Sequence, residues 1–242
     1  MAQIGFNSNT GVIRNNNEDA CFVIPSHNVY VVADGVGGNN AGEIASRTCV
    51  RGVAEYVAAN PIEDCEDDQA IYQYFTRCLG LVNEEIYQMG QKHKENKGMA
   101  TTVVIAYIRE NTAYVINVGD SRAYLYRQGR ISQITEDHTY VNELLRNGVI
   151  TTEEAENHSQ KNVITRAVGA DPSIKADFFQ TQLEKNDILM LCSDGLYGEV
   201  DEQKLVEILD KKNTMSGTCA RLVEEAIRCG GRDNITVVCL KI

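Results

Sequence analysis

The sequence contains no tryptophan and three prolines, and none of its stretches is dominated by glycine and serine. None of its apolar runs approaches the roughly 18 residues that a transmembrane helix needs. The opening MAQIGFNSNT lacks a basic region followed by an apolar region, so no signal peptide is expected. The sequence has no C-x-x-C pair and no histidine near a cysteine at zinc spacing. This argues against a zinc site and a disulfide framework.

Basic residues are also in the minority. The chain has 23 Lys and Arg against 34 Asp and Glu, a formal net charge of -11. Nucleic acids and anionic membrane surfaces select for basic patches, so neither is expected as a partner. The eight cysteines are expected to be buried free thiols of a cytoplasmic protein. With 242 residues and no visible linker, we expect a single domain over residues 1–242, monomeric in solution.

Apolar periodicity predicts strands and helices in blocks. Strands are expected at 20–24, 29–33, 101–108, 113–120, 187–195 and 234–242, with a hairpin over 121–134 that turns at Gly129. Helices are expected at 42–60, about 66–95, 205–209 and 219–227. The polar region 139–162 should contain short helical pieces. One ends at Gly148, and Thr151 with Glu154 can form a capping box.

These blocks predict an α+β fold. Consecutive strands often lie too close for a crossover helix, so they should pair antiparallel. The segments VYVVA and ILMLC are apolar at every position, so both faces of each strand should be covered. A four-layer α-β-β-α sandwich satisfies this, with two central antiparallel sheets flanked by helices.

Four aspartates stand at the ends of apolar segments. Asp34 follows VYVVA, Asp120 follows INVG, Asp194 follows ILMLCS, and Asp233 precedes NITVV. A single Asp-Gly at a strand end is ordinary turn chemistry. Several at one sheet end would repel, because like charges about 4 Å apart cost about 4 kcal/mol at an effective dielectric near 20. The pattern therefore predicts bound cations.

The types of ligand favour particular cations. Carboxylate and carbonyl oxygens suit magnesium, manganese or calcium. Gly35 lets the chain turn tightly enough for its carbonyl to face a cation held by Asp34. Arg14 precedes the acidic pair Glu18 and Asp19 by four and five residues, so one turn could present a guanidinium and carboxylates to a phosphate. Each of these residues alone is more simply a surface or turn residue.

Other catalytic signatures are missing from the sequence. It has no G-x-x-x-x-G-K-[ST] nucleotide loop and no kinase motifs, and Ser193 lies in LCSDG rather than G-x-S-x-G. Two oxygen-ligated cations are a recurring device for displacement at phosphorus. The residues alone therefore favour phosphoryl chemistry without naming the substrate.

The chain resembles the metal-dependent type 2C protein serine/threonine phosphatases, most closely their compact bacterial form, over about Gly5 to Leu240. Eight motifs occur in the family's order: TGVIRNNNED, VVADGVGG, GMATT, NVGDSRAY, TEDH, ITRAVG, LCSDGL and RDNITVV. The resemblance implies a binuclear manganese or magnesium centre at one edge of a two-sheet sandwich, with a third metal in bacterial relatives. It also implies that residues 139–162 form a mobile flap that helps to choose substrates.

The resemblance assigns roles by motif. Asp34 is expected to bridge two metals, and Asp194 and Asp233 to complete one site. Gly35 is expected to ligate the other metal through its carbonyl. Glu18 is expected to act through metal-bound water, and Asp19 to lie in the layer behind the ligands. Asp120 is expected to hold the third metal together with Asp194. Arg14 is expected to clamp the phosphate. The expected reaction is hydrolysis of phosphoserine and phosphothreonine with a metal-bridging water as nucleophile.

One departure concerns the general acid. Family members commonly carry a histidine after the Asp-Gly or after the glycines, whereas here those positions are Val36 and Asn39. Neither side chain can donate a proton as an acid near pH 7. A metal-bound water is the favoured replacement, and His138 of TEDH is expected to be a structural histidine.

Three alternatives remain at this point: a two-metal phosphodiesterase or nuclease, a catalytically weak or regulatory pseudophosphatase that binds phosphoproteins, and a β-sandwich with no site. The acidic charge argues against a nuclease. The presence of every expected acid argues against a pseudophosphatase. The expected partners are phosphorylated proteins and a serine/threonine kinase that this phosphatase would oppose.

Overall fold

The computed structural model describes residues 3–37 and 41–242, and its strands form two antiparallel sheets. The strands of the first sheet, in spatial order, are β1 (Gln3–Asn9), β11 (Ile235–Lys241), β10 (Ile188–Cys192), β7 (Arg122–Arg127) and β8 (Arg130–Gln133). Those of the second are β2 (Asp19–Ile24), β3 (Val29–Val36), β5 (Val103–Arg109), β6 (Thr112–Val118) and β9 (Asp177–Gln182), with β4 (Ala100–Thr101) also on β3. The expected sandwich and its antiparallel pairing are confirmed.

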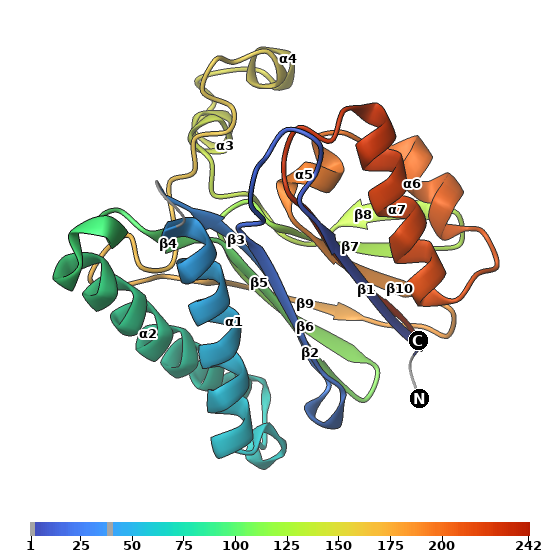
Figure 1. The fold of residues 1–242 in the computed structure, drawn as a ribbon. Coiled ribbons are helices and arrows are strands. Elements are labelled where there is room, and N and C mark those ends of the chain that lie inside the picture. Colours follow the sequence, from blue (N-terminus) through green and yellow to red (C-terminus); the bar gives the residue numbers. More distant parts are fainter. Residues whose placement is uncertain (1–2, 38–40) are drawn as a thin grey trace.

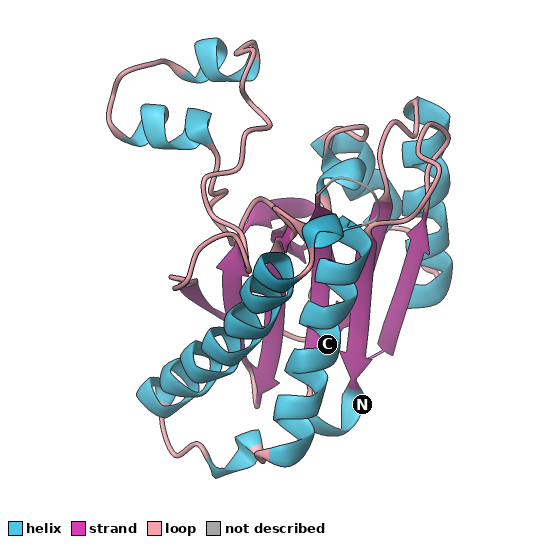
Figure 2. Cartoon of the chain, turned by 60° about the vertical axis from the view of Figure 1, so that its left-hand side comes forward, coloured by secondary structure: helices cyan, strands magenta, loops and turns pink. Residues whose placement is uncertain are grey.

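Helices cover the outer faces of both sheets, as Figures 1 and 2 show. The second sheet is covered by α1 (Ala41–Ala59) and α2 (Asp68–Lys92), the first by α6 (Glu202–Leu209) and α7 (Met215–Cys229). The short helices are α3 (Tyr140–Arg146), α4 (Thr152–Glu156), α5 (Asp194–Tyr197), and the 3-10 turns η1 (Pro25–His27), η2 (Ile62–Asp64) and η3 (Lys94–Asn96). The helices on the outer face of each sheet and the two sheets between them form the four expected layers.

Three apolar clusters fill the spaces between the layers. One lies between the helices α1 and α2 and the second sheet, and another between α6 and α7 and the first sheet. The third lies between the sheets, where Val32, Val104, Leu189 and Val238 are fully buried. Every residue of β10 is buried, as its uninterrupted apolar sequence predicts. The space between the sheets is therefore filled by apolar side chains, and a site with polar groups is expected at the ends of the sandwich.

Some predicted boundaries were wrong. The helix expected over about 66–95 ends at Lys92, and η3 follows it. The strand expected over 101–108 is interrupted at Thr102, whose N–H donates to the Asp34 carbonyl. Strand β9 and the edge strand β1 were not predicted, because their sequences DFFQTQ and QIGFNSN lack a continuous apolar run.

Residues 139–162, here called the flap segment, stand clear of the sandwich beyond one end of the sheets (Figure 1). The segment contains α3 and α4, and the predicted capping box of Thr151 and Glu154 is present at the start of α4. The neighbouring backbone at its foot forms a bridge between Thr139 and Ile164. The segment thus leaves and re-enters the body at one place.

Candidate metal centre

The predicted acids converge at the end of the sandwich that carries the flap segment. In the second sheet, β2 and β3 pair with Asp19 directly opposite Asp34. In the first sheet, the end of β10 lies beside the start of β11 and of β7. Asp194, Asp233 and Asp120 stand just outside these three strand ends. Residues far apart in the sequence are thereby brought to one place.

Burial and mutual repulsion raise the pKa values of these acids. The pKa of Asp34 is raised well above its ordinary value, first by burial and then by the neighbouring carboxylates. Burial raises the pKa of Asp120 to about 7, and Asp194 contributes the largest repulsion. The pKa of Asp194 rises to about 6, through burial and then repulsion from Asp233. Such a cluster gains stability when cations neutralise it.

Asp19 lies beneath the cluster and is held by a hydroxyl network. The Ser193 hydroxyl donates to Asp19 Oδ2 at 2.7 Å, and the Thr236 N–H donates to the Ser193 hydroxyl at 2.9 Å. Asp19 is 5% exposed, and burial raises its pKa to about 7. A carboxylate fixed from behind in this way suits the predicted place behind the ligands.

Arg14 reaches the cluster from the loop between β1 and β2. Its Nη2 donates to Asp233 Oδ2 at 2.7 Å, and this hydrogen bond is the main cause of the raised pKa of Arg14. The second oxygen of Asp233 accepts from the N–H of Asn234 at 2.8 Å. Arg14 is half exposed, so its guanidinium stands between the buried acids and solvent. This is a suitable place for a group that binds an incoming anion.

Two glycines leave room for oxygen atoms. A Cβ on Gly35 would lie 2.0 Å from the Gly42 carbonyl oxygen. A Cβ on Gly42 would lie 2.8 Å from the Gly35 oxygen and 2.9 Å from Glu18 Oε2. The Gly35 N–H donates to the Glu18 carbonyl at 3.1 Å, which fixes the two chains together. The Gly35 carbonyl and the Glu18 carboxylate therefore face a common space.

The residues fit a divalent cation by their chemistry. Within residues 3–37 and 41–242, no three carboxylate, thiol or imidazole groups form a ready-made metal site. The Asp233 carboxylate is paired with Arg14 and does not complete a group of three ligands. Asp194 Oδ1 is buried and has no hydrogen-bond partner in that same part of the chain. The donors are all oxygens, the set that magnesium and manganese prefer.

A groove of about 740 Å³ runs from the acids to the flap segment. Its lining includes Asp120, Asp194 and Asp233 at the acidic end, and Val141, Leu145 and Ala155 on the flap segment. The flap wall is mixed, since Asn142, Thr152 and Lys161 also line it, while the other end is rich in carboxylates. A hollow of this size can take several residues of an extended peptide beside the acids.

Arg122 supports the turn that carries Asp120. Its guanidinium donates to both oxygens of Asp137, at 3.0 and 2.6 Å, and lies 3.6 Å from the centre of the Tyr197 ring. The Tyr197 hydroxyl in turn donates to the Asp120 carbonyl at 2.9 Å. Arg122 is thus committed to a bidentate ion pair and a ring contact within the fold.

Neither Val36 nor His138 is a suitable proton donor in the structure. Val36 is 42% exposed and apolar, and Asn39 lies outside the described residues. His138 is 4% exposed, and both ring nitrogens are engaged within the protein. Its pKa is lowered, chiefly by burial. This geometry supports the structural role expected for His138.

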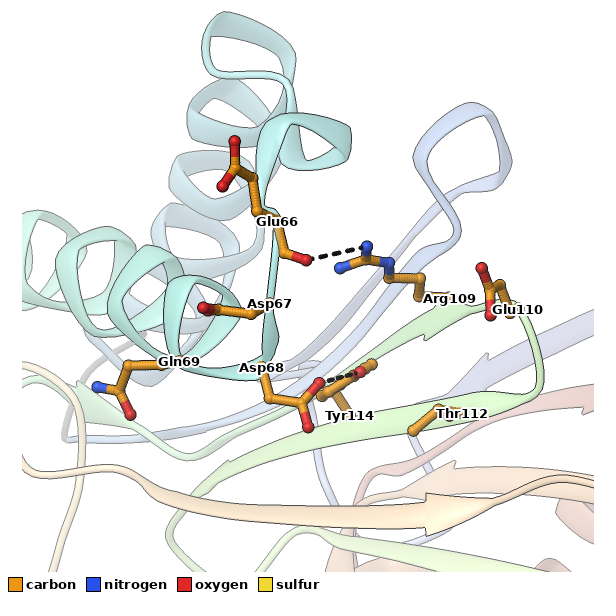
Figure 3. Close-up of a pocket in the computed structure, with 8 residues that line it drawn as sticks. All are labelled: Glu66, Asp67, Asp68, Gln69, Arg109, Glu110, Thr112 and Tyr114. Atoms are coloured by element: carbon orange, nitrogen blue, oxygen red, sulfur yellow. Dashed lines mark hydrogen bonds between the residues drawn. The ribbon is translucent and has the colours of Figure 1, made fainter.

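A second hollow, shown in Figure 3, lies at the opposite end of the second sheet. It is lined by the turn between β5 and β6, seven residue pairs and about 20 Å from the end near Asp120. Its polar groups are already used: Arg109 donates to the Cys65 and Glu66 carbonyls, and Asp68 accepts from the Tyr114 hydroxyl at 2.6 Å. These contacts fix the start of α2, which accounts for them structurally.

Comparison with known proteins shows which family the chain belongs to. A family model described as protein phosphatase 2C matches residues 13–227. The chain belongs to the protein phosphatase 2C family. This 2C phosphatase is 37% identical over 237 residues to the serine/threonine phosphatase stp of Listeria monocytogenes, covering 96% of this chain and 93% of the relative. The type of enzyme that the sequence motifs indicate is thereby confirmed.

Solved structures of 2C phosphatases share the whole fold. The S. agalactiae serine/threonine phosphatase matches with a TM-score of 0.92 and 31% identity, covering 100% of both chains. The catalytic domain of the serine/threonine phosphatase PstP, solved in complex with two manganese ions, matches with a TM-score of 0.86 and 30% identity, covering 99% of this chain and 97% of that one. The manganese ions are thus found in a structural neighbour of this chain, and the oxygen donors of the present site are of the kind that such ions prefer.

Sequence reasoning missed the residues that hold the acids in place. Thr102 accepts from the Asp34 N–H at 3.0 Å and lies 2.7 Å from the Ser121 hydroxyl. Asn234 accepts from the Glu18 N–H at 2.8 Å. Each of these residues is next to a predicted site residue or within one of the eight motifs. Position within a motif was the available signal, since hydroxyl and amide groups carry no charge pattern.

Proposed function

We propose that this phosphatase hydrolyses phosphoserine and phosphothreonine monoesters in proteins, using two manganese or magnesium ions and a third at Asp120. The observation that carries the proposal is the set of buried and half-buried aspartates at one end of both sheets, beside Arg14 and a peptide-sized groove. The names of the relatives support the substrate class, and the PstP complex supports the metal.

Each predicted ligand has a place in this proposal. Asp34 would bridge two cations, Asp194 and Asp233 would complete one site, and the Gly35 carbonyl and Glu18 would serve the other. Asp120 with Asp194 would hold the third. When bound, the cations would activate water for direct attack and neutralise charge on the phosphoryl group. Asp19 would orient the ligands from behind through its contact with Ser193.

Arg14 would bind the phosphoryl oxygens and thereby orient the ester for in-line attack. Its half-exposed guanidinium already binds one carboxylate oxygen of Asp233. A phosphoryl group would compete for that same guanidinium, since Arg forms charge-assisted hydrogen bonds with both anions. The exchange would also release Asp233 toward a cation. Phosphate binding and metal ligation are therefore expected to support each other.

The proposal predicts a metal-dependent monoesterase. A panel of phosphoserine and phosphothreonine peptides should be dephosphorylated with manganese or magnesium, and EDTA should reduce the rate to background. A bis-ester substrate should be hydrolysed far more slowly, which separates this activity from a phosphodiesterase. Undiminished turnover in EDTA would contradict the proposal. Metal and phosphopeptide binding without turnover would instead favour a regulatory pseudophosphatase.

Arg14→Ala should lower kcat/KM for phosphopeptides by roughly 30–150-fold, because a charge-assisted hydrogen bond contributes about 2–3 kcal/mol. Arg14→Lys should recover part of the loss. Arg228 provides a matched control: it is 70% exposed and paired with Glu225 on α7. Arg228→Ala should leave steady-state kinetics unchanged. Equal kinetics for Arg14→Ala and the wild type would remove Arg14 from the site.

The cellular setting follows from the substrate chemistry. Phosphoserine and phosphothreonine are made by protein kinases, so a serine/threonine kinase should supply the substrates that this enzyme consumes. Within the described residues, none of the helices is long and apolar enough to cross a membrane. The eight cysteines are free, which supports our placement of the protein in the reducing cytoplasm. We also propose a single domain that acts as a monomer.

A further inference from the structure

His138 stands at the foot of the flap segment and contacts the turn that carries Asp120. The Gly119 N–H donates to His138 Nδ1 at 3.0 Å, and the His138 N–H donates to the Gly119 carbonyl at 3.0 Å. Because Nδ1 accepts, the proton of the neutral ring must lie on Nε2. The imidazole therefore faces the Asp120 turn with one specific nitrogen.

The other ring nitrogen faces the chain that returns from the flap segment. His138 Nε2 lies 3.2 Å from Arg166 Nη1 on that chain and 3.2 Å from Asp177 Oδ2 at the start of β9. Arg166 Nη1 also donates to Asp177 Oδ1 at 2.8 Å. The Thr165 N–H donates to the His138 carbonyl at 2.8 Å. His138 thus directly precedes the flap segment and is hydrogen-bonded to Thr165, three residues after the segment ends.

The Asp120 turn is also packed against Thr102, which links it to Asp34. Gly119 has a φ of +102°, and a Cβ there would lie 2.6 Å from Thr102 Cγ2. On the other side of Asp120, the Ser121 hydroxyl lies 2.7 Å from Thr102 Oγ1, which accepts from the Asp34 N–H. A displacement of Gly119 is therefore passed to Asp120 and toward Asp34.

We infer that His138 is a positioning residue that couples the flap segment to the cation held by Asp120. One ring nitrogen fixes the Gly119–Asp120 turn, while the other contacts Arg166, on the chain that returns from the flap segment, and Asp177 of β9. This inference rests on the proposed role of Asp120 as a ligand. It assigns His138 no contact with the reacting atoms. By linkage, cation binding at Asp120 and order in the flap segment stabilise each other.

Two substitutions separate the two ring nitrogens. His138→Asn places an amide oxygen near the position of Nδ1 and removes the atom that reaches Asp177. His138→Gln places an amide nitrogen near the position of Nε2 and removes the acceptor for the Gly119 N–H. Manganese binding is measured by isothermal titration calorimetry, and order in residues 139–165 by hydrogen exchange.

The glutamine variant should bind the weakest manganese ion roughly 10–100-fold less tightly, the usual effect of losing a group that orients a ligand. The asparagine variant should bind within about threefold of wild type but exchange its flap amides faster. In an Asp120→Asn background, His138→Gln should have no further effect on binding. A purely structural His138 would lower thermal stability in both variants and leave their manganese affinities equal, which would overturn the inference.

The wild-type protein gives a test that does not depend on folding of a His138 variant. Manganese should slow hydrogen exchange in residues 139–165 of wild type, and Asp120→Asn should abolish this slowing. Equal slowing in both proteins would overturn the coupling. If Asp120→Asn instead leaves manganese stoichiometry and affinity unchanged, the assignment of Asp120 as a ligand fails, and the inference fails with it.

Discussion

Asp194→Asn is expected to lower phosphopeptide kcat/KM by roughly 10³-fold or more, while making the metal-free protein harder to unfold. The two effects have one cause. Asp194 lies among buried carboxylates, and burial together with repulsion from Asp233 raises its pKa to about 6. Asparagine removes that charge from the cluster at nearly the same volume. It also removes an anionic oxygen that the cations need.

The measurements are phosphopeptide turnover with manganese and thermal unfolding in EDTA. Asp201→Asn is the matched control, because Asp201 is exposed and its carboxylate caps α6 by accepting from the Lys204 N–H, which asparagine can also do. The control should keep wild-type turnover. If Asp194→Asn destabilised the metal-free protein as well as inactivating it, the electrostatic account of the cluster would be wrong.

The second large effect is the response of stability to pH and metal. In the folded state the pKa values are about 7 for Asp19 and Asp120 and about 6 for Asp194, against an ordinary value of 3.8. Between about pH 4 and pH 7 the folded chain therefore holds more protons than the unfolded chain. The contribution of these three groups to the free energy of unfolding of the metal-free protein is fully present below about pH 4. It is lost as the pH rises through 6 to 7.

The loss should amount to several kcal/mol, because each pKa unit corresponds to about 1.4 kcal/mol. In EDTA the melting temperature should fall by on the order of 10 °C between pH 5 and pH 8. His138 acts in the opposite direction below about pH 6.5, since burial lowers its pKa, but it is one group against three. Manganese should raise the melting temperature, and more so at pH 8, where protons no longer compete for the oxygens.

Differential scanning calorimetry at pH 5, 6, 7 and 8, with EDTA or with manganese, tests this expectation. Asp194→Asn should flatten the pH dependence in EDTA. A melting temperature that rises with pH in EDTA would contradict the raised pKa values. A manganese effect that is equal at pH 5 and pH 8 would show that the cation does not replace protons on these carboxylates.

The parts of the fold that were predictable are those with an uninterrupted local signal. Strand β10 is apolar at all five positions and is wholly buried, and the capping box of α4 needs only Thr151 and Glu154. Strand β1 carries no such signal, because in its sequence QIGFNSN the apolar Ile4 and Phe6 are separated by Gly5 and flanked by polar residues. It forms because it pairs with β11, where Gly5 lies opposite Cys239. Gly5 also lies against the backbone at the start of α7.

In the candidate site, too, some residues could be predicted from the sequence and some contacts could not. Strand-end acids such as Asp34 and Asp194 could be identified because a charge after an apolar strand is conspicuous. The ion pair between Arg14 and Asp233 could not, because its partners are 219 residues apart and depend on the meeting of β1 and β11. The role of His138 depends likewise on the path by which the flap segment returns. Only the three-dimensional arrangement reveals such long-range partners.

The place of β11 has a consequence for biosynthesis. This strand lies between β1 and β10, yet it comprises residues 235–241, and Asp233 lies two residues before its start. A ribosome-bound chain that stops short of Asp233 leaves a gap in the middle of one sheet and cannot recruit the partner of Arg14. Nascent and prematurely terminated products should therefore be inactive toward phosphoproteins, so this topology delays dephosphorylation until translation has passed the last strand.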